Sequence, residues 1–298
     1  MIGHTLIDSA RVHELTNGTY VEHACSSDTP TIYKLTTVAF AGRTTACEDV
    51  VIADSPTYGR MLFLDGELQS AETDQVLYHE MLVQPIMAAT ANISNRRVLI
   101  VGGGEGATAQ EVLRCTGVND VVWIDIDKGL VDLCRRHLDW VENNVYNDSR
   151  LHFIAEDIRT ALPRYGQFDV IILDLPDPDK EEIAADGLYG TSFWALIHTH
   201  LAPGGAIVSH AGPVIPGADK EKYRTGLHLI ESKVSEGYPY HIFIPSFQSE
   251  WGFWMSVPPL TSAVYPPTCS VIDDEVMTVA CTWSRYWTSS AVGTIRPL

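Results

Sequence analysis

The stretch RVLIVGGGEGATAQEV, residues 97–112, decides the fold of this chain. An apolar run leads into a glycine-rich loop and then a helix-forming segment, as at the top of a parallel sheet in nucleotide-binding folds. The loop glycines are Gly102, Gly103, Gly104 and Gly106. Glu105 lies among them, and its carboxylate disfavours a phosphate or a ligand carboxylate but favours an ammonium group. The sequence therefore predicts a pocket for a cationic nucleoside, although a purely structural strand-to-helix turn has the same glycine pattern.

Acidic residues also follow later strands. One strand ends at Asp125 and Asp127, roughly 20 residues after the glycines, where an acid holds ribose hydroxyls in related folds, and Asp125 is the better candidate. Two further strands end at Asp157 and Asp174. An aspartate after a strand is also a common helix N-cap. Acids in four successive units, counting the one in the loop, nevertheless predict a shared ligand crevice beyond the carboxyl ends of the strands.

Composition and charge favour a soluble protein that handles cations. The chain has 298 residues, with 20 Lys and Arg against 38 Asp and Glu, and a formal net charge of −18. This charge disfavours nucleic acid and anionic membranes as partners and steers polycations inward, although acidic surfaces also serve solubility alone. No apolar run approaches the roughly 20 residues of a membrane helix, and residues 1–28 lack a signal-peptide pattern. We therefore expect a cytoplasmic protein.

The six cysteines show no CxxC pairing. They are Cys25, Cys47, Cys115, Cys134, Cys269 and Cys281. Neither a zinc site nor a disulfide scaffold is indicated, so we expect reduced thiols and no metal.

The chain divides near residue 72. Residues 1–71 are expected to form a small antiparallel β domain, because three segments rich in β-formers are separated by turn residues. These segments are residues 31–44, 48–55 and 59–70. Residues 72–89 fit a helix, after which strands and helices alternate. Residues 72–298 are therefore predicted to be a catalytic domain of the α/β class, with a doubly wound, mostly parallel Rossmann-like sheet and a short helix or strand near 276–287.

Four motifs carry a resemblance to a known family. In chain order they are SPTYGRMLFLDGELQSAETDQVLYHEML (55–82), VLIVGGGEGATAQEV (98–112), DVIILDLPDP (169–178) and HAGP (210–213). Over about residues 30–256 the chain resembles the polyamine aminopropyltransferases, the spermidine and spermine synthase family. DIDKGLVDLCRRHL, DLPDP, AGP and IPSFQSEWGFWM are most similar to thermospermine synthases.

The resemblance implies a reaction. The aminopropyl group of decarboxylated S-adenosylmethionine, a co-substrate, is transferred to a polyamine amine, and methylthioadenosine is released. No metal and no prosthetic group are implied, and the assembly is usually a homodimer or homotetramer.

The catalytic residues follow from the same resemblance. An amine with a pKa of roughly 10 is protonated at neutral pH, yet it needs its lone pair to displace the sulfonium. Asp174 matches the family's proton acceptor. Asp177 matches a ligand of a substrate ammonium, although an aspartate before a proline is also a common turn residue. Tyr78 matches a hydrogen-bond partner of the attacking nitrogen.

The resemblance also implies the donor site. Gln69 and Asp125 resemble the residues that hold the ribose and its neighbourhood. Asp157, with the backbone at Ile158, resembles the adenine contact. Glu105 resembles the acid that binds the aminopropyl nitrogen of the donor.

For the acceptor, the resemblance implies three contacts. His79 matches a family contact at the amine site, and Phe247 and Trp251 match aromatic residues that line the polyamine tunnel. Without the surrounding motifs, a lone histidine or such aromatic residues are more often part of the core.

Departures from the family pattern bear on the acceptor. Leu175 and Pro176 stand where many spermidine synthases have small hydroxyl residues, and His210 stands where a glutamine is usual. The segment that follows adds the acids Glu181, Glu182 and Asp186, which are either acceptor contacts or simply solvated. We therefore expect a spermidine-like triamine as the favoured acceptor, with putrescine still open.

Three function classes remain open. The first is the aminopropyltransferase. The second is an N-methyltransferase that uses S-adenosylmethionine, and Glu105 discriminates between the two because the extra carboxylate of that donor would lie near it. The third is a non-catalytic polyamine-binding protein, against which Asp174, Asp177 and Tyr78 argue.

Overall fold

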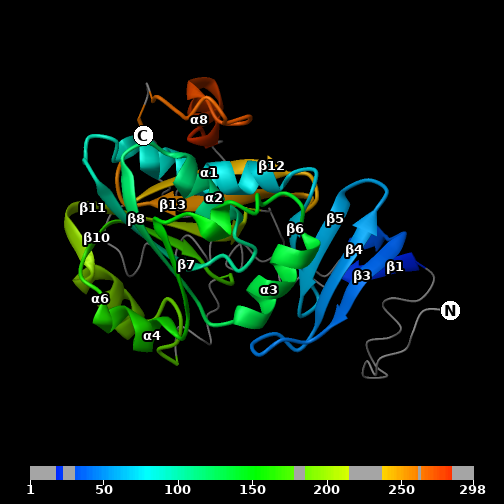
Figure 1. Ribbon diagram of the computed structural model, residues 1–298. Coiled ribbons are helices and arrows are strands. Elements are labelled where there is room, and N and C mark those ends of the chain that lie inside the picture. Colours follow the sequence, from blue (N-terminus) through cyan, green and yellow to red (C-terminus); the bar gives the residue numbers. More distant parts are fainter. Residues whose placement is uncertain (1–17, 23–30, 178–184, 215–236, 261–262, 284–298) are drawn as a thin grey trace.

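A seven-stranded sheet forms the centre of the computed structural model, which describes residues 18–22, 31–177, 185–214, 237–260 and 263–283 (Figure 1). The strands are β7 (Arg96–Gly102), β8 (Val118–Asp125), β9 (Leu151–Ala155), β10 (Phe168–Asp174), β11 (Leu201–Pro213), β12 (Tyr238–Ile244) and β13 (Ser249–Met255). Their order is β12-β13-β11-β10-β7-β8-β9. The strands from β7 to β11 run parallel, and β13 and β12 add an antiparallel edge. The predicted α/β class with a mostly parallel sheet is confirmed.

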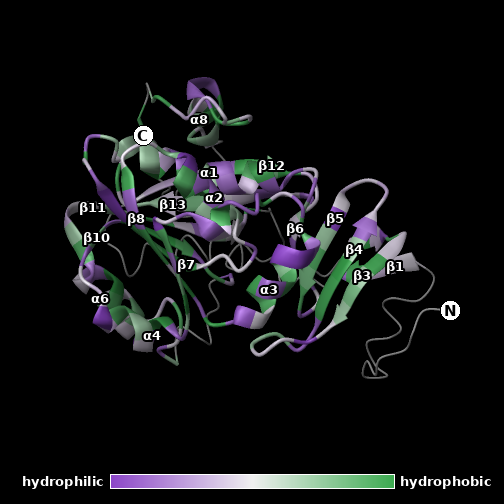
Figure 2. Ribbon diagram, in the orientation of Figure 1, coloured by the Kyte–Doolittle hydropathy of each residue, from purple (hydrophilic) through white to green (hydrophobic). Residues whose placement is uncertain are grey.

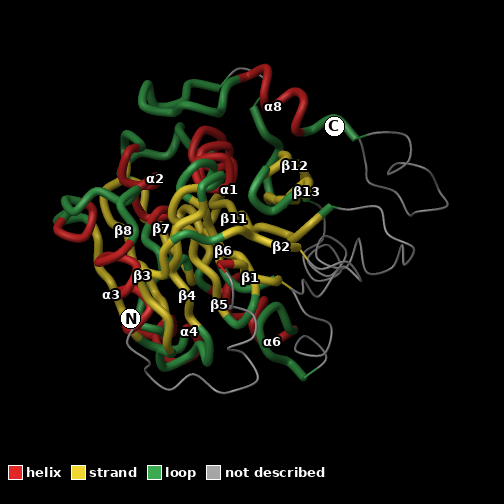
Figure 3. Tube along the Cα trace, turned by 90° about the vertical axis from the view of Figure 1, so that its right-hand side faces the viewer, coloured by secondary structure: helices red, strands yellow, loops and turns green. Residues whose placement is uncertain are grey.

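Helices cover both faces of this sheet, with α1 and α2 on the side away from α4 and α6 (Figure 3). They are α1 (Gln75–Ala89), α2 (Ala107–Arg114), α3 (Lys128–His137), α4 (Ile158–Ala161), α6 (Thr191–Thr199) and α8 (Asp274–Ala280), with short 3₁₀ turns η2 (Val145–Asn147) and η3 (Leu162–Arg164). Side chains of β7 alternate between the two faces, so Val98 and Ile100 join the α1 and α2 core while Leu99 and Val101 join the α4 and α6 core. The central strands are accordingly hydrophobic along their length (Figure 2).

The helix α1 begins three residues later than the sequence predicts. Its N-cap, Asp74, makes no side-chain cap bond, because its carboxylate accepts hydrogen bonds from N–H and Oγ of Ser246 at 2.6 and 2.8 Å. Most of the residues of α1 from His79 onward are buried. The helix therefore lies inside the protein, and it carries Tyr78 and His79 into the region of the predicted site.

The N-terminal strands form two small antiparallel sheets. They are β1 (Thr19–Glu22) with β2 (Thr31–Lys34), and β3 (Thr37–Gly42), β4 (Val50–Ser55), β5 (Gly59–Leu64) and β6 (Glu67–Ala71). The expected segment 59–70 is thus two strands, since Asp65 and Gly66 have φ of 49° and 94° and form a tight hairpin turn. The segment 31–44 also splits, and β1 was not predicted.

The four-stranded N-terminal sheet, β3 to β6, packs against α3. Val50 and Ile52 of β4 lie in one cluster with Leu130 and Leu133 of α3. Arg60 adds a 2.6 Å hydrogen bond to the carbonyl of His137, at the end of α3. The division at residues 71 and 72 into two domains stays a prediction.

Two further features concern the tail and the cysteines. The helix α8 lies in the region where the sequence predicts a short element, and residues 284–298 lie outside the described part. Cys47, Cys115, Cys134, Cys269 and Cys281 are free thiols, and Cys25 is not among the described residues. No helix in the described ranges combines the length and apolar character needed to cross a membrane.

Candidate active site

The glycine loop lies between β7 and α2 and fits closely against the end of β10. Gly102 has φ +80°, and a Cβ on it would lie 2.1 Å from the carbonyl oxygen of Asp174. Gly103 has φ +69°, and its N–H donates a 2.7 Å hydrogen bond to the same oxygen. At Gly104, a Cβ would lie 3.0 Å from Leu130 and 3.3 Å from Asp125 Oδ2. The glycines therefore bring Asp174, Glu105 and Asp125 together around one loop.

Asp174 is held at both carboxylate oxygens. The hydroxyl of Tyr78, on α1, donates to Oδ1 at 2.7 Å. The hydroxyl of Thr108, in the first turn of α2, donates to Oδ2 at 2.5 Å. A carboxylate has about four lone-pair positions, so these two donors fix its orientation and leave others for a ligand. Asp174 therefore stands ready to accept a proton from a group bound beside it.

His79 and Glu105 form a buried ion pair. His79 Nε2 lies 2.7 Å from Glu105 Oε1, and His79 Nδ1 lies 2.7 Å from the carbonyl oxygen of Gln75. Both ring nitrogens thus face acceptors, which favours the doubly protonated ring. Burial lowers the pKa of His79, but the Glu105 carboxylate outweighs it and the pKa rises to about 9. Glu105 Oε2 is buried and has no hydrogen-bond partner in the described structure, so it is left to bind a ligand donor.

Asp125 and Asp127 differ in availability. Asp127 caps α3 at Leu130 N (3.0 Å) and accepts from Ala46 N (2.9 Å) and the Thr44 hydroxyl, and these bonds hold the pKa of Asp127 down despite burial. Asp125 Oδ1 accepts from Asp127 N at 2.7 Å. Burial raises the pKa of Asp125 to about 6. Asp127 therefore ties the N-terminal sheet to α3, while Asp125 faces the glycine loop.

Asp157 and Gln69 have local hydrogen-bond partners of their own. The carboxylate of Asp157 caps α4 at Arg159 N (2.8 Å) and pairs with the Arg159 side chain at 2.6 Å, which lowers the pKa of Asp157. Its neighbour Ile158 is buried. Gln69 is exposed on β6, and its amide lies 3.4 Å from the carbonyl of Glu67. Their predicted roles at adenine and ribose stay predictions.

Aromatic side chains connect Tyr78 to the acceptor residues expected from the sequence. The ring centroids of Tyr78 and Phe247 are 6.4 Å apart, and those of Phe247 and Trp251 are 4.7 Å apart. The turn that carries Phe247 is fixed to both N-terminal sheets. The carbonyl of Pro245 accepts a 3.2 Å hydrogen bond from Tyr58, between β4 and β5, and the carbonyl of Ser246 accepts a 2.9 Å hydrogen bond from Tyr33, on β2. Its position therefore depends on residues outside the parallel sheet.

Asp177 lies beyond β10, at the edge of this aromatic row. Its side chain is 47% exposed, and Oδ1 lies 3.5 Å from Nδ1 of His210. A Cβ on Gly212, which has φ +79°, would lie 3.2 Å from Oδ2. The acids Glu181 and Glu182, expected near the acceptor, lie outside the described residues. Asp186 is described, and its carboxylate binds Ser192 at 2.5 and 2.9 Å at the start of α6.

The arrangement matches a known family. The model for the spermine/spermidine synthase domain matches residues 75–263, from the first residue of α1 through β13. This chain belongs to the spermine/spermidine synthase family. The match leaves out the N-terminal sheets, although they hold the turn at Phe247.

Individual relatives agree with the family. A polyamine aminopropyltransferase of Pseudomonas aeruginosa is 41% identical over 226 residues, which cover 76% of this chain but only 63% of that protein. A thermospermine synthase of Arabidopsis thaliana is 33% identical over 239 residues, 80% of this chain and 69% of the relative. A spermidine synthase structure from Thermotoga maritima covers 92% of this chain and 94% of its own, with a TM-score of 0.77 and 19% identity. The last of these shows a shared fold.

Two residues of this family member escaped the sequence analysis. Thr108 was not singled out, yet its place in the first turn after the glycine loop points it at the end of β10. Asp74 was not singled out, yet it fixes Ser246 and with it the Phe247 turn. A polar residue at the start of a helix that follows a ligand loop is the signal that would have found Thr108.

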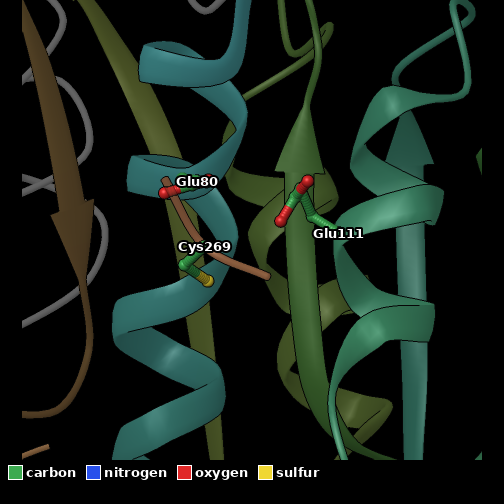
Figure 4. Close-up of side chains that lie close together, drawn as sticks. All are labelled: Glu80, Glu111 and Cys269. Atoms are coloured by element: carbon green, nitrogen blue, oxygen red, sulfur yellow. The ribbon is translucent and has the colours of Figure 1, made fainter. Parts of the chain in front are cut away.

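Glu80, Glu111 and Cys269 lie close together, with ligand atoms within 4.8 Å of one another (Figure 4). Both Glu80 oxygens already accept hydrogen bonds from backbone N–H groups of residues 270–272, at 2.7–3.0 Å. Glu111 accepts one from Gln84 at 2.9 Å. Burial raises the pKa of Cys269 to about 12. The Glu80 carboxylate therefore docks the tail onto α1.

Proposed function

We propose that this protein is a polyamine aminopropyltransferase. It moves the aminopropyl group of decarboxylated S-adenosylmethionine to an amine and releases methylthioadenosine. The observation that carries the proposal is the Asp174 carboxylate, fixed by Tyr78 and Thr108 beside the glycine loop that holds Glu105. Membership of the family and the names of its relatives support the same activity.

Asp174 serves the chemistry as a proton acceptor. A protonated amine has no lone pair to attack the carbon beside the sulfonium, so its proton must leave first. Asp174 has lone pairs free for that proton after binding Tyr78 and Thr108. The sulfonium leaves as a neutral thioether, so no acid is needed at the leaving group. Alignment of nitrogen, carbon and sulfur supplies the rest of the rate increase.

Glu105 serves the donor. Its free, buried Oε2 needs a hydrogen-bond donor, and the ammonium of the aminopropyl group is one. S-adenosylmethionine carries a carboxylate on the same arm, which would place an acceptor against this oxygen. Asp125, buried beside Gly104, is the candidate for the ribose hydroxyls.

The acceptor is proposed to be a spermidine-like triamine rather than putrescine. Leu175 and Pro176, which follow Asp174, supply no side-chain hydrogen-bond donor, and Asp177 supplies a carboxylate further out. The 33% identity to a thermospermine synthase supports a longer amine. We further propose that the protein is cytoplasmic and that it forms a homodimer or homotetramer. Light scattering on the purified protein tests the proposed assembly.

One assay tests the function. The protein is incubated with each of the two donors and with a panel of di-, tri- and tetra-amines, and the products are identified by mass. We expect a mass gain of one aminopropyl group on a polyamine, with decarboxylated donor only. A methylated amine formed from S-adenosylmethionine would establish the N-methyltransferase instead, and no product with any pair would leave a binding protein.

A further inference from the structure

His210, on β11, is a buried histidine, and one of its ring nitrogens already has a hydrogen-bond partner. Its side chain is 5% exposed. Nε2 lies within hydrogen-bond distance of the carbonyl oxygen of Leu175. A carbonyl only accepts, so Nε2 must carry the hydrogen. The ring therefore ties β11 to the segment between Asp174 and Asp177, and in its neutral form it has a lone pair at Nδ1.

That Nδ1 faces Asp177. The distance to Oδ1 is 3.5 Å, longer than a well-formed hydrogen bond, and Nδ1 is buried without a hydrogen-bond partner in the described structure. When His210 is neutral, two hydrogen-bond acceptors, His210 Nδ1 and Asp177 Oδ1, lie opposite each other across this distance. Such a pair needs a donor between them, because a buried acceptor without one is costly.

The walls of the gap favour a cation. The ring of Trp251 lies parallel to that of His210, with centroids 6.2 Å apart at 14°, and the Tyr78 ring lies 6.0 Å away. Tyr78 gives its hydroxyl hydrogen to Asp174, and Phe253, the partner of His210 on β13, does not titrate. Apart from His210, the charged group that acts on Asp177 in the described structure is the carboxylate of Glu67.

We propose that His210 Nδ1 and the Asp177 carboxylate together bind one ammonium group of the acceptor amine. The proposal rests on the proposed function and adds to it a specificity-determining residue. An ammonium carries three N–H donors, enough to bond both acceptors at once. The bare backbone of Gly212 lets the Asp177 carboxylate lie against β11, close to the ring.

The proposal depends on an acceptor at position 210. A glutamine there retains an acceptor, whereas a leucine has none.

Calorimetric titration of spermidine into the protein saturated with methylthioadenosine tests the proposal. His210→Leu is expected to weaken binding about tenfold. His210→Gln, which retains an acceptor, is expected to keep most of the wild-type affinity. His241→Gln is the matched control, since His241 lies on β12 and contacts Glu250 at 2.9 Å. Affinity for methylthioadenosine reports that each variant is folded.

The outcomes separate the two proposals. Unchanged spermidine affinity in His210→Leu, or equal losses of affinity in His210→Leu and His210→Gln, overturns the role of His210 while aminopropyl transfer stands. Absence of both transfer and amine binding in the wild type overturns the proposed function and this inference with it. Nitrogen-15 NMR of the wild-type protein gives an independent reading: the neutral ring should carry its hydrogen on Nε2, and the Nδ1 signal should move when spermidine binds. A ring with its hydrogen on Nδ1 alone contradicts the proposal.

Discussion

The hydroxyl of Tyr78 lies 2.7 Å from Oδ1 of Asp174, although 96 positions separate the two residues in the chain. Burial, followed by the nearby Asp174 carboxylate, raises the pKa of Tyr78 well above its usual value. Tyr78 therefore remains a hydroxyl donor at neutral pH. Asp174, rather than Tyr78, is therefore the group that we propose takes the proton of the amine.

Replacing Asp174 by asparagine should lower kcat by at least about 100-fold, because the amide keeps the shape but cannot take the proton. Affinity for methylthioadenosine, measured by calorimetry, should stay close to wild type. Asp169→Asn, at the start of the same strand, where Asp169 accepts a 2.8 Å hydrogen bond from Arg97 N, is the control. Wild-type turnover in Asp174→Asn would exclude Asp174 as the base.

Thr108→Val should reduce kcat by about tenfold, since it removes a hydrogen bond to Asp174, the proposed proton acceptor, while keeping the side-chain shape. Thr108→Ser retains the hydroxyl and should restore most of the activity. Steady-state kinetics with both substrates should show the loss in kcat rather than in KM. If valine and serine variants lose equal activity, packing rather than the hydroxyl is what Thr108 provides.

Glu105→Gln should weaken binding of decarboxylated S-adenosylmethionine by about tenfold or more, because a charge-assisted hydrogen bond to its ammonium is lost. The preference over S-adenosylmethionine should narrow in the same variant. Calorimetric titration with both donors measures this, and Glu156→Gln, which alters a surface pair with Arg164, is the control. Tighter binding of S-adenosylmethionine by the wild type, with a methylated product, would refute the aminopropyl assignment.

The pair of His79 and Glu105 should make stability depend on pH. The pKa of His79 rises from 6.5 to about 9 on folding, so the native state binds its proton more tightly than the unfolded state. The resulting stabilisation is fully present below pH 6.5 and is lost as pH rises through about 9, with a slope of up to roughly 1.4 kcal/mol per pH unit. Urea unfolding should show that the free energy of unfolding changes less with pH in His79→Gln than in wild type. An unchanged pH dependence in His79→Gln, or an equal reduction in the exposed His152→Gln, would contradict the role given to the pair of His79 and Glu105.

Spermidine should exceed putrescine in kcat/KM by at least about tenfold, because each extra ammonium held by a carboxylate adds a charge-assisted hydrogen bond. Replacing Glu181 and Glu182 by glutamine should narrow that gap if these acids contact the triamine. Initial rates with both amines at saturating donor measure it. Equal efficiency, or a preference for putrescine, would remove the triamine proposal and leave the enzyme class intact.

The sequence predicts the parallel sheet and the convergence of its acids for a physical reason. The carboxyl ends of parallel strands share one edge, so the glycine loop, Asp125 and Asp174 had to meet once the strand pattern was recognised. The roles of Tyr78 and Asp177 came from the resemblance, because no local pattern says which side chains of a buried helix face a strand end.

Other contacts lay beyond local reasoning. The Asp74 carboxylate looks like a helix cap in sequence but binds Ser246, 172 positions away. Asp157, for which a contact with adenine stays a prediction, also caps α4 and pairs with Arg159, and the sequence alone did not show that pairing. Where a side chain has two possible partners of similar strength, tertiary packing determines which one it contacts, and local sequence does not encode that packing.

The hydrogen bonds from the backbone of residues 270–272 to the Glu80 carboxylate have a practical consequence for the design of truncated variants. Glu80 follows Tyr78 and His79 directly on α1, and its buried carboxylate has backbone donors from the tail. A protein cut short before residue 269, to remove a Pro-rich and Ser-rich end that looks dispensable, would leave the Glu80 carboxylate without these donors on the helix that carries Tyr78 and His79. Shortened versions should therefore end no earlier than α8.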